Sequence, residues 1–119
     1  MVRSVLVVDD DQSFRELAAR LLTAWGHDVV GEAGTVADAL TKAAELHPDA
    51  VVADITLPDG DGYQLTEHLV ALRWPIRVVL ISANTDPGMG PAAQRAGAQG
   101  FLAKNELSEI ALRQLLEGR

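Results

Sequence analysis

The sequence contains no cysteine, and this absence excludes several classes of protein at once. Disulfide frameworks, cysteine nucleophiles and thiolate metal sites all depend on that residue. Long apolar runs are also missing, since none approaches the roughly 20 residues of a bilayer-spanning helix. Residues 1–8 are too short for a signal peptide, and three aspartates follow them at once. These features predict a cytoplasmic domain with no direct contact to a membrane.

Basic residues are few compared with acidic ones. The chain carries 10 lysines and arginines against 17 aspartates and glutamates, a formal net charge of -7. A domain this acidic repels DNA phosphates and anionic lipid head groups, so neither is expected as a direct partner. The same excess of carboxylates permits a local cluster that could hold a divalent cation, although most of the acidic residues are expected to be solvated surface groups.

The 119 residues fit a single compact domain spanning residues 1–119, and a hydrophobic content of 48% supplies one substantial core. Short apolar runs alternate with segments that have helical spacing. The runs predict strands at residues 4–8, 27–33, 49–54, 77–82 and 101–103. The spaced segments predict helices at residues 14–25, 36–46, 63–72, 91–96 and 108–117.

Five strands alternating with five helices predict an α/β fold, a parallel sheet covered on both faces. Right-handed crossovers bring the carboxyl end of every strand to one edge of such a sheet. Ligands of open parallel sheets bind outside that edge, where the strand order reverses.

Polar side chains stand at or just beyond the ends of four predicted strands. They are Asp9, Asp10, Asp54, Ser82 and Lys104. Clustered carboxylates repel one another, and a bound cation relieves that repulsion. Oxygen ligands suit Mg2+, and a carboxylate beside this ion can attack phosphorus to form an acyl phosphate. Phosphoryl transfer needs stabilisation of the charge on three equatorial oxygens. Mg2+, the Lys104 ammonium and the Ser82 hydroxyl could each interact with one of them.

Each of these residues also has a structural explanation. An aspartate after the first strand could cap the following helix, and we assign that role to Asp11. Asp54 alone could be a turn residue. Ser82 alone could be a strand-end hydroxyl that bonds the backbone, and Lys104 alone a surface lysine. Asp59 and Asp61 are interpreted as turn formers, because their loop lacks the spacing and final glutamate of a calcium-binding EF-hand. The presence of the whole set at one predicted edge favours the functional interpretation.

Four segments together resemble the response-regulator receiver family over essentially the whole chain. Residues 6–10 are similar to its first strand with an acidic pair, and residues 52–62 to its phosphoacceptor segment. Residues 81–83 match the hydroxyl strand, and residues 96–104 match the strand that ends in lysine. The resemblance implies a flavodoxin-like, doubly wound (βα)5 fold with strand order 2-1-3-4-5.

The resemblance also implies a role for each site residue. Asp54 would accept a phosphoryl group from a sensor histidine kinase. Asp10 and Asp54 would bind Mg2+ together with the backbone carbonyl of Thr56, and Asp9 would act through ordered water. The protein would be a switch with autocatalysed phosphorylation and dephosphorylation, not a turnover enzyme.

The remaining family roles concern the response to phosphorylation. Ser82 and Lys104 would grip the phosphoryl oxygens. Phe101 occupies the position of the aromatic switch, although it could also be an ordinary half-exposed strand residue. The output would be a remodelled face made by the fourth helix, the fifth strand and the fifth helix.

The sequence departs from the common family pattern at two places that affect structure. Asn105 follows Lys104 where many members have proline, which predicts a trans peptide and is similar to receivers that precede a LuxR-type helix-turn-helix. Residues 85–91 hold two prolines and two glycines, which predicts a short or mobile fourth helix with Pro91 at its first position. The last helix is expected to turn Ile110, Ala111, Gln114 and Leu115 inward.

Several functions remain open at this point. The segment 115–119 looks like a domain edge, so DNA binding would come only through an output domain that is not part of this chain. A lone receiver that acts through protein partners is the alternative, and a homodimer on phosphorylation is a family expectation. A haloacid-dehalogenase-type phosphatase would need a second acid two residues after Asp54, where Thr56 stands. A third hypothesis is an interaction module that no longer accepts a phosphoryl group.

Overall fold

A computed structural model describes residues 3–118. The first two residues of segment 1–8 and the last residue of segment 115–119 lie outside the described residues. The elements follow one another along the chain as β1 (Ser4–Val8), α1 (Gln12–Ala24), β2 (Asp28–Ala33), α2 (Val36–Leu46), β3 (Ala50–Asp54), β4 (Thr56–Leu57), β5 (Gly60–Asp61), α3 (Gly62–Val70), β6 (Arg77–Ser82), α4 (Met89–Ala96), β7 (Gly100–Ala103), the short 3-10 helix η1 (Lys104–Glu106) and α5 (Glu109–Glu117).

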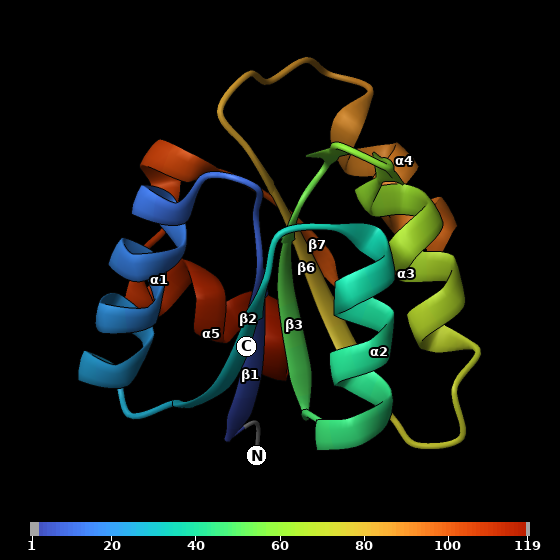
Figure 1. The fold of residues 1–119 in the computed structure, drawn as a ribbon. Coiled ribbons are helices and arrows are strands. Elements are labelled where there is room, and N and C mark those ends of the chain that lie inside the picture. The colour runs from blue at the N-terminus through green and yellow to red at the C-terminus, as the bar shows by residue number, and fades with distance from the viewer. Residues whose placement is uncertain (1–2, 119) are drawn as a thin grey trace.

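The main sheet has five parallel strands in the order β2-β1-β3-β6-β7 (Figure 1). Because β4 and β5 form a separate small hairpin, this order is the predicted 2-1-3-4-5, and the flavodoxin-like fold is confirmed. The five strands run in the same direction, from the end of the molecule where β1 begins toward the opposite edge, so their carboxyl ends meet there (Figure 1). No helix within residues 3–118 combines the length and apolar character needed to cross a membrane.

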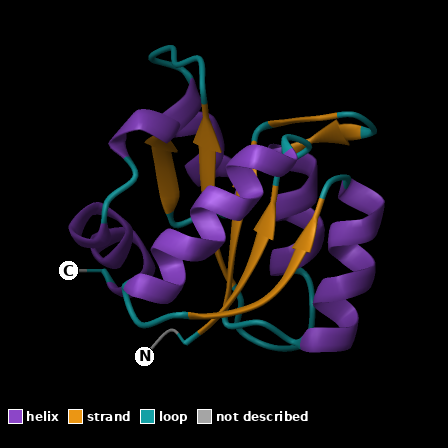
Figure 2. Ribbon diagram, turned by 60° about the vertical axis from the view of Figure 1, so that its left-hand side comes forward, coloured by secondary structure: helices purple, strands orange, loops and turns teal. Residues whose placement is uncertain are grey.

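The sheet separates two hydrophobic clusters, which explains why its central strands are apolar on both faces. Helices α2, α3 and α4 cover one face and α1 and α5 cover the other (Figures 1 and 2). Along β1, Leu6 and Val8 belong to the first cluster while Val5 and Val7 belong to the second. The two-residue period of the strand therefore sends alternate side chains into different cores.

Side-chain caps begin four of the helices. The predicted cap is confirmed at Asp11, whose carboxylate accepts a hydrogen bond from the Ser13 backbone N–H at 3.0 Å. Thr35 caps α2 and Ser108 caps α5 in the same way, through hydroxyl oxygens that accept backbone N–H groups. Asp61 caps α3, so this turn residue also fixes a helix start. Each cap satisfies a donor that the first helical turn leaves unpaired.

The region before α4 confirms one prediction and corrects another. The helix is short, beginning only at Met89 and ending at Ala96. Pro91 is its third residue and not its first. Proline is compatible with this position because the first four N–H groups of a helix have no acceptor within the helix. The loop that holds Asp59 and Asp61 contains the short β4–β5 hairpin.

The predicted inner face of α5 was only partly right. Leu115 is half-buried and packs against the second hydrophobic cluster, and Ala111 is also half-buried. Leu112 and Leu116 are fully buried, whereas Ile110 is 66% exposed and Gln114 is also exposed. Leucine or isoleucine occurs on several sides of this helix, so the apolar pattern does not fix its rotation. The rotation of α5 is set by Leu112 and Leu116, which lie one turn apart and pack on β6 and the second hydrophobic cluster.

Asp59 has a structural role that its place in a turn did not indicate. Its two carboxylate oxygens accept hydrogen bonds from the backbone N–H groups of Val36 at 2.7 Å and Ala37 at 3.0 Å. These donors belong to the first turn of α2, more than 20 residues earlier in the chain. The two bonds hold the pKa of the Asp59 carboxyl below its ordinary value of 3.8.

The pH dependence of this contact gives a testable prediction. A carboxyl whose pKa is lower in the folded protein stabilises the fold above its unfolded pKa. That stabilisation is lost as the pH falls through the folded pKa. We therefore expect Asp59→Ala to lower the melting temperature at neutral pH, with the difference from wild type shrinking in acid below pH 3.8. Thermal melts across this range test it, with the exposed Glu45→Gln on the same helix as the control; a difference independent of pH would contradict the role.

Candidate functional site

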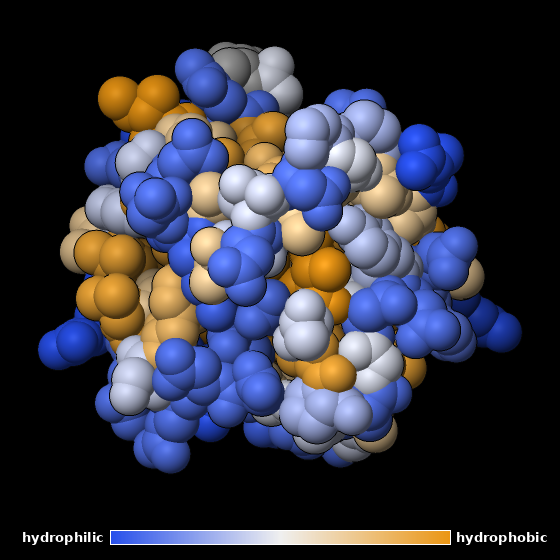
Figure 3. Space-filling model, turned by 90° about the horizontal axis from the view of Figure 1, so that it is seen from above, coloured by the Kyte–Doolittle hydropathy of each residue, from blue (hydrophilic) through white to orange (hydrophobic). Residues whose placement is uncertain are grey.

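The predicted site residues meet at the carboxyl edge of the sheet. Asp9 directly follows β1, Asp54 is the last residue of β3, and Ser82 is the last residue of β6. Asp54 pairs with Ile81 and Ser82 pairs with Ala103, so Lys104 follows the next strand at about the same level. Figure 3 looks down on this edge and shows hydrophilic side chains over much of its middle, interspersed with apolar ones. Strand register therefore assembles residues that are far apart in sequence.

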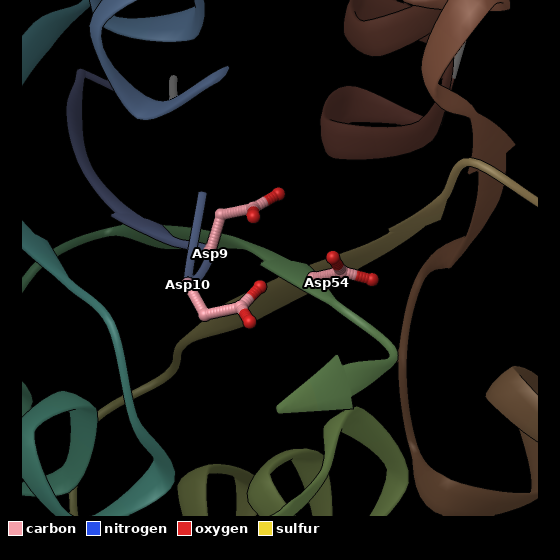
Figure 4. A group of neighbouring side chains, drawn as sticks. All are labelled: Asp9, Asp10 and Asp54. Atoms are coloured by element: carbon pink, nitrogen blue, oxygen red, sulfur yellow. The ribbon is translucent and has the colours of Figure 1, made fainter. Parts of the chain in front are cut away.

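Three carboxylates form the centre of the site. Ligand oxygens of Asp9, Asp10 and Asp54 all lie within 4.8 Å of one another. Figure 4 shows Asp9 and Asp10 side by side after β1, with Asp54 projecting from β3 beside them. Asp9 has no exposed surface and Asp54 is 8% exposed, whereas Asp10 is open to solvent. The cluster is thus buried on one side and accessible on the other.

Lys104 bridges two of the carboxylates. Its Nζ lies 2.7 Å from Oδ2 of Asp9 and 3.1 Å from Oδ2 of Asp54. Only 17% of the Lys104 side chain is exposed, so it is not the surface lysine of the alternative interpretation. Oδ2 of Asp9 accepts no well-directed hydrogen bond, and its contact with the ammonium is an ion pair. This buried oxygen therefore retains capacity for a further positive ligand.

The electrostatic balance of the site is reflected in two pKa shifts. Burial raises the pKa of the Asp9 carboxyl above its ordinary value, although Lys104 and the Asp11 backbone N–H oppose this, and the Asp54 charge adds to it. Burial by itself lowers the pKa of the Lys104 ammonium, but its contacts with Asp9 and Asp54 outweigh burial and leave the pKa raised. One ammonium thus offsets part of the repulsion among three carboxylates.

The turn that presents Asp9 and Asp10 is held by Arg15, which was not predicted as a site residue. The Arg15 guanidinium donates from Nη1 to the Asp9 backbone carbonyl at 2.5 Å, and its Nε lies 3.4 Å from the Glu32 carboxylate. The Asp11 N–H also donates to Oδ1 of Asp9 at 2.9 Å. Arg15 follows Asp10 by more than one helical turn, so only the folded turn shows this contact.

A second turn fixes Asp54 and Thr56. The Thr56 N–H donates to Oδ1 of Asp54 at 3.2 Å, and the Gly62 N–H donates to the Ile55 carbonyl at 2.7 Å. The Thr56 side chain is exposed, whereas its backbone N–H bonds the Asp54 carboxylate. The hairpin β4–β5 follows at once and sets the path of the chain away from the site.

Ser82 and Phe101 have their own partners outside the carboxylate cluster. The Ser82 hydroxyl donates to the Asn84 carbonyl at 2.6 Å and accepts from the Asn84 N–H at 3.2 Å. In this conformation Ser82 is therefore a strand-end hydroxyl that bonds the backbone, as its structural interpretation predicted. Phe101 is half-buried and packs on the cluster formed with α2, α3 and α4.

Phe14, at the start of the predicted helix 14–25, is a second contact of the site that was not predicted. The Lys104 Nζ lies 4.3 Å from the centroid of the Phe14 ring. This distance is within the range of a cation–π contact. The ring also packs on the second hydrophobic cluster, so the apolar spacing of α1 was correct but revealed only one of its two contacts.

The donor set fits a hard divalent cation. Mg2+ prefers one or two protein carboxylates plus water and phosphate oxygens. Asp10 and Asp54 offer accessible carboxylate oxygens, and the incompletely bonded Oδ2 of Asp9 faces the same cluster. Nitrogen and sulfur ligands are absent from this group, which argues against zinc.

Comparison with known proteins identifies the family to which this fold belongs. The family model for the response regulator receiver domain matches residues 5–117. A putative transcriptional regulator of Pseudomonas aeruginosa is 38% identical over 110 residues, which are 91% of this chain and 53% of that protein. The transcriptional activator DevR/DosR of Mycobacterium tuberculosis is 36% identical over 102 residues, covering 85% and 47%. The chain thus spans about half the length of these curated relatives.

Solved structures agree with this assignment. The signal receiver domain of the putative response regulator NarL from Mycobacterium tuberculosis superposes with a TM-score of 0.87 at 34% identity, covering 99% of this chain and 98% of that one. The chain belongs to the response regulator receiver family. It is a receiver domain, a phosphoacceptor switch by family and not a conventional enzyme, with transcriptional regulators among its relatives.

Proposed function

We propose that Asp54 accepts a phosphoryl group from a sensor histidine kinase and that the domain then changes its output face. The observation that carries this proposal is the placement of Asp54 in one cluster with two further carboxylates and the Lys104 ammonium. A phosphatase of the haloacid-dehalogenase type has no support here, because Thr56 with its exposed side chain stands where the second acid is needed.

Mg2+ is the proposed cofactor. Asp10, Asp54 and the Thr56 backbone carbonyl would be its protein ligands, and the buried Asp9 would act mainly through ordered water. When bound, the ion supplies positive charge next to the phosphoryl oxygens and lowers the repulsion between the carboxylates. The exposure of Asp10 allows a solvated ion to reach the cluster.

The transfer itself needs positioning more than covalent chemistry from the protein. A carboxylate oxygen of Asp54 attacks phosphorus, and the bond from phosphorus to the kinase imidazole nitrogen breaks. The electron pair of that bond stays on the imidazole, which takes up a proton. Lys104 would shift from its carboxylate partners to one phosphoryl oxygen. The Ser82 hydroxyl would exchange its hydrogen bond to Asn84 for one to a second phosphoryl oxygen. Hydrolysis of the acyl phosphate at the same site would return the domain to its starting state.

The signal would pass from the site through Ser82 and Phe101. Movement of the Ser82 hydroxyl toward the phosphoryl group frees space at the end of β6, and Phe101 on the neighbouring strand would turn inward. Phe101 is half-buried, so an inward turn would bury more of its ring. Phosphorylation would then shift the populations of two arrangements of the face formed by α4, β7 and α5.

The partners of the whole protein follow from its relatives and from its charge. A DNA-binding output domain outside this chain would carry out transcriptional regulation, because the net charge of -7 disfavours direct DNA contact. Phosphorylation would favour a homodimer through the α4-β7-α5 face. The proposed location is the cytoplasm, where the kinase would supply the phosphoryl group.

Beryllofluoride, which mimics a phosphoryl group, provides the direct test. We expect wild-type protein to bind it only with Mg2+, with amide NMR shifts near Asp54, Ser82 and Phe101 that extend to α4 and α5. Asp54→Ala should abolish these shifts while the protein remains folded. Size-exclusion chromatography with light scattering of the same samples tests the dimer.

Each result decides between the remaining functions. Mg2+-dependent shifts that depend on Asp54 support the switch. A folded wild-type protein that gives no shifts would favour an interaction module that no longer accepts a phosphoryl group. Shifts without a change in mass would favour a receiver that acts as a monomer through other partners.

A further inference from the structure

Among the described residues, the Lys104 ammonium contacts two carboxylates and one aromatic ring, and only the ring keeps its chemistry throughout the proposed reaction. The carboxylates are those of Asp9 and Asp54, at 2.7 Å and 3.1 Å. Asp54 becomes an acyl phosphate when it accepts a phosphoryl group, and Asp9 belongs to the carboxylate cluster that fits a cation. The third neighbour is the ring of Phe14, 4.3 Å away, which neither reacts nor binds metal.

Phe14 is held firmly enough to act as a fixed surface. It lies in the first turns of α1, and its ring packs against the hydrophobic cluster that includes Leu22 and Leu112. The aromatic face carries partial negative charge and attracts an ammonium over it. Lys104 is largely removed from water, which strengthens this attraction.

We propose that Phe14 is a positioning residue for the phosphoacceptor reaction, which holds the Lys104 ammonium over the site when a cation and a phosphoryl group take its carboxylate partners. The inference rests on the proposed function of Asp54. Phe14 does not touch the reacting atoms, and its effect is transmitted through Lys104 alone. A side chain of similar size without a π face should therefore fill the space but lose the function.

Beryllofluoride affinity in the presence of Mg2+ is the first measurement. We expect Phe14→Leu to weaken it about fivefold, which corresponds to about 1 kcal/mol for a partly desolvated cation–π contact. Phe14→Tyr, which keeps the aromatic face, should restore the affinity. Leu17→Ala is the control, because Leu17 lies one turn further along α1 and its side chain is 43% exposed.

A double-mutant cycle separates positioning from packing. If Phe14 acts through Lys104, Phe14→Leu should have no further effect on affinity in the Lys104→Ala background. An equal loss in both backgrounds would overturn the proposal, because it would show that the ring supports the site only by filling space.

The NMR signals of the Lys104 side chain give a readout that does not require the double variant to fold. Ring currents should shift the protons next to the Lys104 ammonium upfield in wild type, and this shift should disappear in Phe14→Leu. It should persist when beryllofluoride and Mg2+ are added. Loss of the shift on addition would show that Lys104 leaves the ring and would overturn the proposal.

The outcomes also separate this inference from the function on which it rests. Failure of wild type to bind beryllofluoride with Mg2+ would contradict the proposed function itself. Normal binding by wild type together with an unchanged affinity of Phe14→Leu would contradict only the role of Phe14.

Discussion

Replacement of Lys104 by alanine is expected to destabilise the unliganded protein by roughly 3 kcal/mol, because it leaves buried carboxylates without a counter-charge. Asp9 has no exposed surface and its Oδ2 loses its ammonium partner at 2.7 Å. Asp54 loses the same partner at 3.1 Å. Removing one partner of a buried ion pair has a range of costs, and the lower end applies here. The reason is that 17% of the Lys104 side chain and 11% of the Asp54 side chain reach solvent.

Mg2+ should reverse much of this loss. Removing the ammonium makes the three-carboxylate cluster more negative, so its affinity for a cation rises. A ligand that binds only the folded state stabilises it in proportion to the logarithm of its concentration. We therefore expect millimolar Mg2+ to raise the melting temperature of Lys104→Ala more than that of wild type.

Urea denaturation with and without Mg2+ measures both effects. Glu109→Gln is a matched control, because its ion pair with Arg113 at 2.8 Å is exposed on both sides. Breaking an exposed pair costs at most about 1 kcal/mol and should not depend on Mg2+. Equal losses of stability in the two variants would contradict the prediction, as would the same Mg2+ response in Lys104→Ala and wild type. Either result would show that Lys104 does not neutralise the carboxylate cluster.

Replacement of Gly62 by alanine is expected to destabilise the protein by about 2–3 kcal/mol and to disturb the site as well. A Cβ at this position would stand 2.7 Å from the Asp54 backbone carbonyl oxygen and 3.0 Å from the Ile55 Cα. Both are backbone atoms of the turn that carries Asp54, so they cannot rotate away as a side chain would. Relief of the clash has to displace either that turn or the start of α3.

Gly90→Ala is the matched control for this prediction. It also lies in the first turn of a helix, α4, but an added Cβ meets nothing within 4 Å. Alanine favours helix over glycine, so the free energy of unfolding should rise by up to about 1 kcal/mol. Urea denaturation gives the sign of each change, and Mg2+ titration should show weaker binding only for Gly62→Ala. A neutral Gly62→Ala would mean that the turn has more freedom than these contacts indicate.

The sequence predicted much of the fold because its signals are local. Capping residues such as Asp11 and Thr35 bond donors within three residues, so their effect is readable from short segments. The apolar runs of the central strands are buried on both faces, which fixes them as strands of a parallel sheet. Chain order then fixed the common edge at which Asp9, Asp54 and Lys104 meet.

The sequence could not predict features that depend on which surfaces meet. Ile110 and Leu112 are equally apolar, and only packing on β6 exposes the first and buries the second. The segment around Asp59 has the composition of a turn, but the fold brings the Asp59 carboxylate to the first turn of α2. Pro91 is compatible with several positions of a first helical turn, so its place in α4 was decided by the preceding loop.

By itself, the sequence of this receiver domain determined the alternation of elements, the polar residues at the strand ends and the family. Local spacing and hydrogen-bonding chemistry are sufficient for these. Only the tertiary structure decided that Lys104 pairs with Asp9 and Asp54 and lies over Phe14. It also showed that Arg15 holds the turn of the acidic pair. These contacts join residues from different elements, and their distances arise from helix and strand packing that no local pattern encodes.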